Sequence, residues 1–183
     1  IHTDFIHLPE GNSRINVKVK HGDETEINGQ GPVITEEAIN ELFAKLDTLT
    51  KEDILVLAGS IPNTLPEDIY EKILASLESK GIRIVVDATK DLLLNVLKYH
   101  PFLIKPNNHE LGEMFGTVCK TDEDIVHYAK KLQEKGAVNV LISMAGDGAI
   151  LITEDGQNIK MGTPKGKVVN SVGAGDSMVA GFI

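Results

Sequence analysis

The feature that most constrains the fold is a regular alternation of short apolar runs with amphipathic helical patterns between residues 54 and 143. The runs Ile54–Ala58, Arg83–Asp87 and 138–143 have the length and the aliphatic character of buried strands. Between the first two, the segment 69–77 places its apolar residues at the spacing of one helix face. Strands that alternate with helices build right-handed βαβ units and a mostly parallel sheet with helices on both faces. The pattern therefore predicts an α/β fold.

Local signals mark where the helices begin and end. Thr35 is an N-cap residue in front of a helical period. Residues 64–67, Thr-Leu-Pro-Glu, match a capping box with proline in the first turn, and Gly81 is a C-terminal cap, so a helix is predicted between them. The remaining elements predicted here are a strand at 102–105 and helices around 93–97, after Asn107 and from Thr121 to Gly136.

The two ends of the chain have a different pattern. Alternating apolar residues at 15–19, a turn at 21–23 and a partner run at 24–28 predict a β-hairpin, and residues 4–8 are a candidate third strand. Near the other end, segments 149–153 and 157–161 flank an Asp-Gly turn, which predicts antiparallel edge strands. An extended run at 167–170 follows. We thus expect a small β element at residues 1–32 and an α/β core at residues 33–183.

Composition narrows the classes of function. The chain has 183 residues, 18 Lys plus Arg against 27 Asp plus Glu, and a net charge of −9, which disfavours nucleic acid or an anionic membrane as a partner. The single cysteine, Cys119, fits a reducing compartment, and no apolar run reaches the roughly 18 residues that span a bilayer, so a cytoplasmic location is expected. An anionic ligand would need placed cations and backbone N–H groups.

The strongest local motif is Val-Gly-Ala-Gly-Asp-Ser at residues 172–177, where a strand leads into a helix. Glycines at a helix start let backbone N–H groups approach an anion, and the helix dipole adds partial positive charge there. Asp176, in the same turn, would accept a proton from a hydroxyl close to that anion. Taken alone, a motif of this kind is more often an ordinary glycine turn with a helix-start aspartate.

Three further motifs follow predicted strands, at the edge of a parallel sheet where ligands bind. Ser60 lies in Gly-Ser-Ile-Pro and is a candidate phosphate contact, Asn107 and Glu110 lie one helical turn apart and would orient Mg²⁺ waters, and residues 143–148 form a glycine-rich loop suited to nucleotide phosphates. Each also has a structural reading: an ordinary loop, a helix cap and a β-turn. Arg14, Asn16 and Lys18 share the polar side of the early hairpin, which is usually solvated.

The order of these motifs along the chain resembles the ribokinase-like sugar kinases of the phosphofructokinase-B type. The motifs are R-x-N-x-K, G-S-x-P, K-P-N-x-x-E, S-x-x-G-x-G and V-N-S-V-G-A-G-D-S. Thr25-Glu26-Ile27-Asn28 with Gly31-Pro32 makes the chain most similar to the members that phosphorylate fructose 1-phosphate, with tagatose 6-phosphate as the near alternative. The resemblance implies a three-layer α/β/α sandwich with a mostly parallel central sheet, antiparallel edge strands and a small β-sheet lid.

The resemblance also implies a reaction and its residues. ATP would phosphorylate the 6-hydroxyl of fructose 1-phosphate to give fructose 1,6-bisphosphate, with Mg²⁺ as the metal. Asp176 matches the catalytic base, and the backbone of Gly173, Ala174 and Gly175 the anion hole. The other matches are the nucleotide loop Ser143, Met144, Ala145, Gly146, Asp147 and Gly148, the Mg²⁺-organising pair Asn107 and Glu110, and the sugar-phosphate contacts Arg14, Asn16, Lys18 and Ser60.

There are departures from the family pattern. The usual glycine-alanine of the nucleotide loop is reversed here as Ala145-Gly146. Family members have further strands before residue 1 and helices after Ile183, so we expect a segment of a longer protein, and the lid implies a homodimer. An alternative of another class is a non-catalytic sugar-phosphate or nucleotide-binding module, against which the intact G-A-G-D argues because a binder needs no base. The residues do not settle which sugar phosphate is used.

Overall fold

The computed structural model describes residues 2–21, 23–59, 61–88, 90–168 and 171–183, which form a six-stranded sheet and a two-stranded ribbon. The sheet has the order β3-β4-β5-β6-β7-β8. Its first four strands, β3 to β6, are parallel, and the last two, β7 and β8, are antiparallel edge strands, as the sequence predicts. Their bounds are Ile54–Ala58, Arg83–Asp87, Leu103–Ile104, Asn139–Ser143, Ala149–Ile152 and Asn158–Met161.

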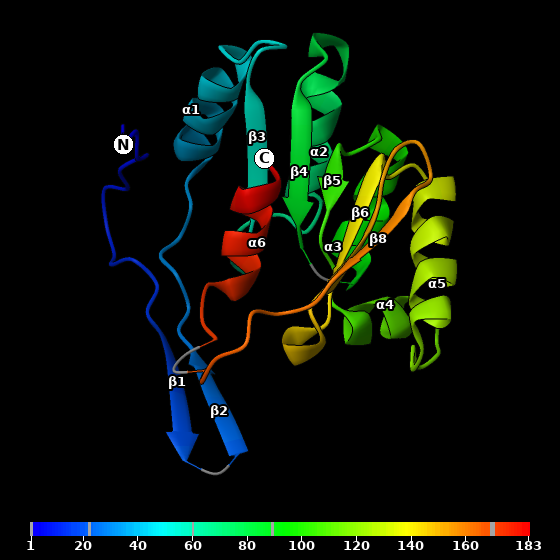
Figure 1. Ribbon diagram of the computed structural model, residues 1–183. Coiled ribbons are helices and arrows are strands. Elements are labelled where there is room, and N and C mark those ends of the chain that lie inside the picture. Colours follow the sequence, from blue (N-terminus) through cyan, green and yellow to red (C-terminus); the bar gives the residue numbers. More distant parts are fainter. Residues whose placement is uncertain (1, 22, 60, 89, 169–170) are drawn as a thin grey trace.

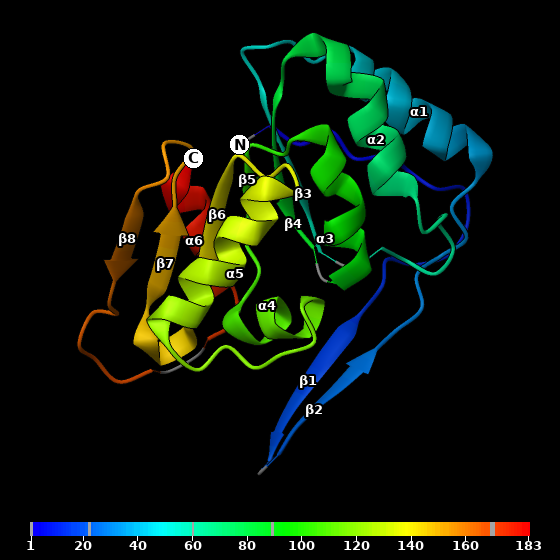
Figure 2. The ribbon, with the colours of Figure 1, turned by 90° about the vertical axis from the view of Figure 1, so that its right-hand side faces the viewer.

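Helices lie on both faces of this sheet and make the fold a three-layer α/β/α sandwich (Figures 1 and 2). One face carries α1 to α5, and the other carries α6. Figure 2 looks onto the five-helix side, with α6 behind the sheet. The helices span Glu36–Asp47, Ile69–Leu77, Lys90–Val96, Asn108–Met114, Asp122–Glu134 and Ala174–Phe182, and short 3₁₀ turns occupy Glu78–Lys80, Leu97–Tyr99 and Ala145–Asp147.

The hydrophobic core divides at the sheet into two unequal parts. Alternate residues of a strand point to opposite faces, so Val86 and Ile104 pack under α1 to α5, whereas Val85 and Leu103 face α6. On the α6 side, Val85, Leu103 and Leu141 form a small buried cluster with Val179 of the helix. The five-helix side holds the main core.

The helix caps predicted at Thr35, Gly81 and Thr121 are confirmed, whereas the one predicted at residues 64–67 is wrong. Thr35 Oγ1 accepts a hydrogen bond from the Ala38 N–H (3.3 Å), and Thr121 and Asp124 form a reciprocal capping box. The box predicted at residues 64–67 does not form. Instead, the Thr64 hydroxyl donates to the Pro32 carbonyl (3.1 Å), so it ties two loops together, and α2 begins only after Asp68.

The ribbon consists of β1 (Asn16–His21) and β2 (Asp23–Asn28), paired antiparallel, and it projects beyond the carboxyl ends of the parallel strands (Figures 1 and 2). The candidate strand at 4–8 does not form. Asp4 instead forms an ion pair with Lys45 of α1 (2.6 Å), which keeps this segment beside the helix and away from the ribbon.

Two smaller expectations concern the last part of the chain and the membrane. Of the extended run predicted at 167–170, residues 167 and 168 belong to no strand, and 169–170 lie outside the described residues. In the part of the chain that the structure describes, no helix combines the length and the apolar character that a bilayer span requires.

Candidate active site

Several of the predicted motifs meet where the parallel strands end. The Lys-Pro-Asn motif directly follows β5, and the glycine-rich loop begins at Ser143, the last residue of β6. Asn107 and Ser143 form a parallel bridge, and the Ser143 N–H donates to the Pro106 carbonyl (3.2 Å). The start of α6 lies on the same side of the molecule, at the lower end of the core in Figure 1. This edge therefore collects the candidate nucleotide, metal and catalytic residues, as expected for a parallel sheet.

The loop at 143–148 closes tightly at its base and exposes its tip. The Met144 N–H donates to the Gly148 carbonyl (2.8 Å), and Met144 is buried, while Ala145, Gly146 and Asp147 are exposed. Gly148 has φ +92°, and a Cβ there would stand 1.9 Å from the Met161 carbonyl oxygen on β8. Only glycine allows this close approach of two strands.

The reversed alanine-glycine order has a visible backbone consequence. Ala145 has φ +47°, in the left-handed region that glycine adopts without steric cost. The Gly146 carbonyl accepts a hydrogen bond from the Thr163 hydroxyl (2.9 Å), which fixes the turn from outside. The loop therefore keeps a left-handed turn even though alanine occupies that position.

The start of α6 has the form that the glycine-rich motif predicts. Gly173 is the N-cap residue with φ +78°, and the Ser177 N–H donates to its carbonyl (2.9 Å). Ala174, Gly175 and Asp176 form the first turn, where backbone N–H groups and the helix dipole favour an anion. The side chain of Asp176 is exposed, so a substrate hydroxyl can reach its carboxylate.

Asn107 and Glu110 form a complete capping box at the start of α4. Asn107 Oδ1 accepts from the Glu110 N–H, and Glu110 Oε2 accepts from the Asn107 N–H, both at 2.8 Å. The structural reading of this pair is thus correct, and its metal role remains a prediction. No cluster of three or more metal-binding side chains occurs among the described residues. Mg²⁺, which keeps several of its waters, suits such a pair better than a metal that needs a full protein cage.

The predicted sugar-phosphate residues lie on other elements. Arg14 is half-buried in the segment before β1, and Asn16 is exposed at the start of β1, opposite Asn28. The backbone of Lys18 lies in β1 opposite Glu26, and its side chain is outside the described parts of the structure. Ser60 lies outside the described residues altogether. Of these residues, Arg14 therefore precedes the ribbon and Asn16 and Lys18 belong to it, whereas the candidate base is on α6.

A tyrosine that the sequence reasoning missed anchors the loop after β3. The Tyr70 hydroxyl is within hydrogen-bond distance of two carbonyl oxygens, that of Ala58 at 3.2 Å and that of Gly59 at 3.3 Å, and its proton is shared between them. Burial raises the pKa of this phenol above its ordinary value, and the negative charge of Asp87 raises it further. Tyr70 thus remains a neutral donor that holds the end of β3 directly before Ser60.

The sequence reasoning also missed a buried ion pair at this edge. Lys105, at the end of β5, is 8% exposed, and its Nζ lies 3.2 Å from Oδ1 of Asp87, at the end of β4. The sequence held a signal for this pair, because Asp87 and Lys105, of opposite charge, stand at the ends of two predicted strands, 83–87 and 102–105. The pair lies on the α6 face: a Cβ added to Gly175 would stand 3.0 Å from the Lys105 ammonium.

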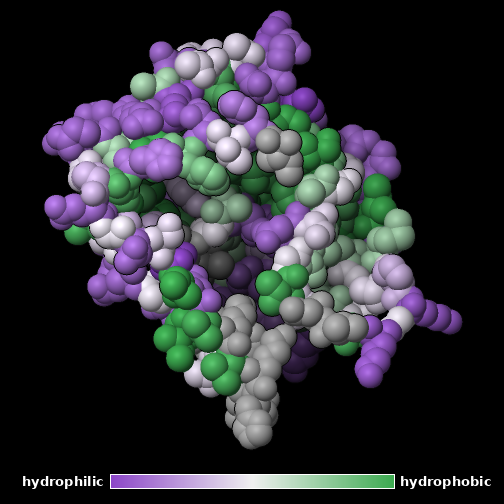
Figure 3. Space-filling view, turned by 90° about the vertical axis from the view of Figure 1, so that its left-hand side faces the viewer, coloured by the Kyte–Doolittle hydropathy of each residue, from purple (hydrophilic) through white to green (hydrophobic). Residues whose placement is uncertain are grey.

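Two apolar grooves flank α6 on its face of the sheet. One, of about 430 Å³, is lined by residues of β6 to β8 and by Met178 and Phe182 of α6, and it reaches Gly148 of the loop. The other, of about 240 Å³, lies between β3 and α6, and Asp87 and Asp176 are among the residues that line it. Figure 3, which faces the left-hand side of Figure 1, shows a hollow in this region of the surface. The candidate base therefore borders a cavity.

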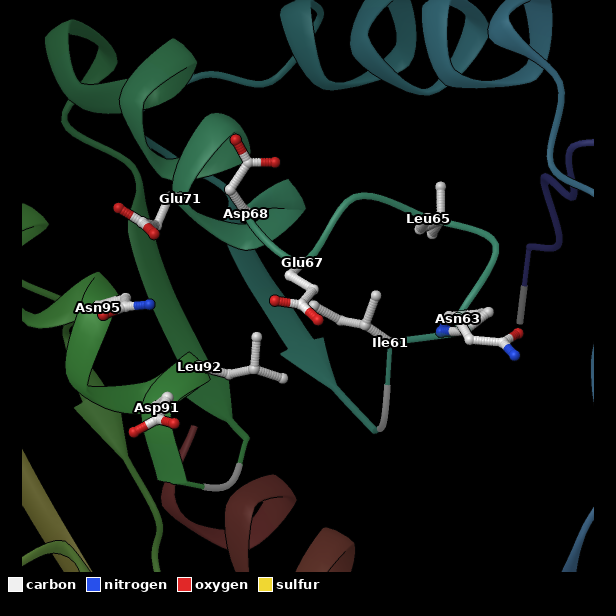
Figure 4. A pocket seen from close by; sticks show the side chains of 10 residues that line it. Ile61, Asn63, Leu65, Glu67, Asp68, Glu71, Asp91, Leu92 and Asn95 are labelled. Carbon is white, nitrogen blue, oxygen red and sulfur yellow. The ribbon is translucent and has the colours of Figure 1, made fainter.

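A larger cavity lies elsewhere among the described residues and has the wrong charge for a phosphorylated ligand. It measures about 660 Å³, between the loop before α2 and the helices α2 and α3, and four carboxylates line it (Figure 4). Two of these carboxylates are already in ion pairs, Asp68 with Lys72 and Glu71 with Lys98. Cavity size alone would therefore indicate a different place from the candidate site at α6.

Comparison with known proteins gives relatives along the whole chain. The model of the "pfkB family carbohydrate kinase" matches residues 1–183. The chain is 53% identical to the 1-phosphofructokinase of Bacillus subtilis over 95% of its own length and 57% of the relative's, and 37% identical to the D-tagatose-1-phosphate kinase of Bacillus licheniformis over 99% and 59%. It thus spans a little over half the length of the curated relatives it matches.

Solved structures agree with the observed fold. A Staphylococcus aureus protein assigned as a phosphofructokinase matches with a TM-score of 0.84 and 47% identity, over 97% of this chain and 57% of that one. Phosphofructokinase-2 of Escherichia coli with fructose-6-phosphate matches at 0.77 and 26%, over 86% and 52%. Arabidopsis thaliana ribokinase, at 0.65 and 21% over 88% and 51%, shares the fold. The chain belongs to the pfkB family of carbohydrate kinases, and its fold is ribokinase-like.

Proposed function

We propose that this chain carries the phosphoryl-transfer centre of a 1-phosphofructokinase, which uses ATP to phosphorylate fructose 1-phosphate at its 6-hydroxyl. The observation that carries the proposal is the exposed carboxylate of Asp176 in the first turn of α6, directly after the left-handed Gly173. A base and a set of anion-facing N–H groups in one turn are what this reaction needs. The 53% identical B. subtilis relative bears the same name.

In the proposed reaction, the sugar 6-hydroxyl oxygen bonds to the γ-phosphorus while the bond from that phosphorus to the β–γ bridging oxygen breaks, and ADP leaves. Asp176 takes the hydroxyl proton. Backbone N–H groups of Gly173, Ala174 and Gly175 stabilise the charge on the moving phosphoryl group. Because phosphoryl transfer depends mainly on position and charge, small errors in the placement of α6 should slow it strongly.

ATP is proposed to lie along the loop Ser143–Gly148, with its base directed to the 430 Å³ groove that adjoins Gly148 and is lined mainly by apolar residues. Asn107 and Glu110 would orient water molecules of a Mg²⁺ ion, and the ion would neutralise phosphate charge. Arg14, Asn16, Lys18 and Ser60 would hold the phosphate that the sugar already carries. A fixed arginine and N–H donors can bind this anion although the chain has a net charge of −9.

The identity of the sugar is the finer part of the proposal. Fructose 1-phosphate is favoured over tagatose 6-phosphate because two relatives are named for 1-phosphates, of fructose and of D-tagatose. The test is a coupled ADP-release assay on the protein at its natural length. It compares fructose 1-phosphate, tagatose 6-phosphate and D-tagatose 1-phosphate as substrates. The highest kcat/KM is expected for fructose 1-phosphate. A preference for tagatose 6-phosphate would contradict the assignment, and tight binding of both substrates without ADP release would favour a non-catalytic binding module.

A second copy of the protein is proposed to cover the ribbon, which would then act as a lid over the sugar. Val17 and Val19 of β1 and Ile27 of β2 are exposed on one side, with Val17 opposite Ile27. An isolated two-stranded ribbon is marginally stable, so an apolar face of this kind favours a partner. Sedimentation of the protein should give a homodimer, and Val17→Asp should convert it to monomer; a dimer that is unaffected by Val17→Asp would contradict a ribbon-mediated contact.

A further inference from the structure

Lys105 is the buried cation of this structure. It and Asn139 are the buried polar residues among those that the structure describes, and Lys105 alone of the two is charged. Taking an ammonium out of water is costly unless a counter-charge lies beside it. Asp87 supplies that charge at 3.2 Å, from the neighbouring strand. The proposed reaction assigns no role to this ion pair, so its presence at the catalytic edge needs an explanation.

The ammonium also lies close to the start of the helix that carries the candidate base. A Cβ at Gly175 would lie 3.0 Å from Lys105 Nζ and 3.4 Å from its Cε, so the end of this side chain leaves little room for any residue but glycine in the first turn of α6. Asp176 is the next residue, and Asp87 and Asp176 line the same 240 Å³ groove. The pair Asp87–Lys105 therefore lies between the strand ends and the turn that carries the candidate base and anion-binding N–H groups.

Stability alone does not account for this arrangement. A buried ion pair gives little net stability compared with apolar side chains of similar volume, and a cation gains nothing from the partial positive charge at a helix N-terminus. A lysine held by an aspartate does provide a fixed support and also neutralises a carboxylate that would otherwise repel an incoming phosphate. Both effects act on the chemistry at α6.

We infer that Lys105, anchored by Asp87, is a positioning residue for phosphoryl transfer: it supports the first turn of α6 at Gly175 and so fixes Asp176 and the N–H groups of that turn. The kinetic part of this inference rests on the proposed function. The structural part, that the order of α6 depends on the Lys105 ammonium, does not.

The test compares three variants of the protein at its natural length: Lys105→Met, the double variant Lys105→Met with Asp87→Asn, and Lys98→Met. Methionine keeps the length of the side chain without its charge and without a fixed end. Lys98 is the matched control, because it forms an exposed ion pair with Glu71 at 2.7 Å. Hydrogen exchange of the α6 amides is measured without substrate, and kcat and KM are measured with ATP and fructose 1-phosphate.

Lys105→Met is expected to speed exchange in α6 and to lower kcat by roughly 100-fold, with a much smaller change in KM, because misplaced groups act mainly on the transition state. Lys98→Met should change neither. Lys105→Met also leaves the partly buried Asp87 charge unpaired, so its thermal midpoint, measured alongside, should fall. The double variant removes that charge, so its thermal midpoint should recover while exchange in α6 stays fast and kcat stays low. Recovery of all three quantities in the double variant would mean that Lys105 only compensates Asp87, and it would overturn the inference.

The outcomes separate the two proposals. If the unmodified protein transfers phosphate and Lys105→Met behaves like Lys98→Met, the positioning role is wrong and the kinase function stands. If the unmodified protein releases no ADP, the proposed function is wrong, and exchange in α6 alone then decides the inference: unchanged exchange in Lys105→Met refutes it.

Discussion

The two faces of the central sheet are covered very differently. On the α1–α5 face, the strand residues Val86, Ile104 and Ile152 are fully buried. On the α6 face, Val56 of β3 is 43% exposed and Ile159 of β8 is 44% exposed, on either side of the one helix that the described residues place there. The candidate base, the nucleotide loop and both grooves beside α6 belong to this open face or its edge. Exposed apolar surface of this kind marks a place where something binds.

The difference separates stability from function. A closed face removes apolar surface from water, and its side chains set the free energy of unfolding. An open face contributes less to that free energy and leaves room for ligands. The ribbon resembles the open face in this respect. Its apolar residues are exposed, although its two strands are paired along six residue pairs.

The largest expected effect is on catalysis at the open face. Asp176→Asn keeps the size of the side chain and removes the base, so kcat should fall by about 10²–10⁴-fold. Asp176 is exposed, so the free energy of unfolding should change by less than about 0.5 kcal/mol. Steady-state kinetics and urea unfolding check both values. Near-normal turnover would show that Asp176 on the open face is not the base. A large loss of stability would show that its main role is structural.

The next effect compares the two faces directly. Ile152→Ala, on β7 under the helices, should destabilise the protein by about 2–5 kcal/mol, because it leaves a cavity in a packed core. Ile159→Ala, on the neighbouring strand β8, should cost less than about 1 kcal/mol, because its side chain is already half in water. Urea unfolding of both variants tests the contrast, and equal losses would show that the faces do not differ in this way.

A third comparison lies within the nucleotide loop. Gly148→Ala adds a Cβ that would meet the Met161 carbonyl oxygen, at a backbone angle suited to glycine, so the cost should be on the order of 1–3 kcal/mol, with weaker ATP binding. Gly146→Ala is the control, because nothing lies within 4 Å of a Cβ at that position. Thermal unfolding and a nucleotide titration separate the two. If Gly148→Ala bound ATP as tightly as Gly146→Ala, the close packing of the loop on β8 would not matter for binding.

The smallest effect concerns the reversed residue order in the same loop. Ala145 has φ +47°, so Ala145→Gly removes a steric cost and should stabilise the protein by about 0.5–1 kcal/mol, after the greater freedom of glycine in the unfolded chain is included. A higher thermal midpoint is the expected result. A lower midpoint would mean that alanine is accommodated at this angle without strain.

The layer order and the parallel sheet were predictable because hydrophobic period and caps are local signals. The helix start at residues 64–67 was predicted wrongly because Thr64 bonds to Pro32, a partner 32 residues away that no local pattern reveals. Likewise, Asp4 lies beside α1 because of Lys45. Long-range pairing overrides local propensity in both cases.

For the site, the motif residues were identifiable because glycine, asparagine and aspartate at strand ends have recognisable chemistry. The support below them had only a weak signal, namely the opposite charges at the ends of two predicted strands. Lys105 and Asp87 are distant in sequence, and their contact requires that β4 and β5 be neighbours in the right register. The close approach of Gly175 to the Lys105 ammonium depends on where α6 crosses the sheet, which no spacing in the sequence specifies.

The central claim is that substrates bind on the open face and at the edge where the parallel strands end, while the rest of the closed face stabilises the fold. Hydrogen exchange tests it most directly. The protein is compared with and without fructose 1-phosphate and a non-hydrolysable ATP analogue. We expect the ligands to slow exchange of the backbone amides at 107–110, 143–148 and 173–182, and not at α2, α3 or the acidic cavity between them. Protection that appears at α2 and α3 but not at the start of α6 would contradict it.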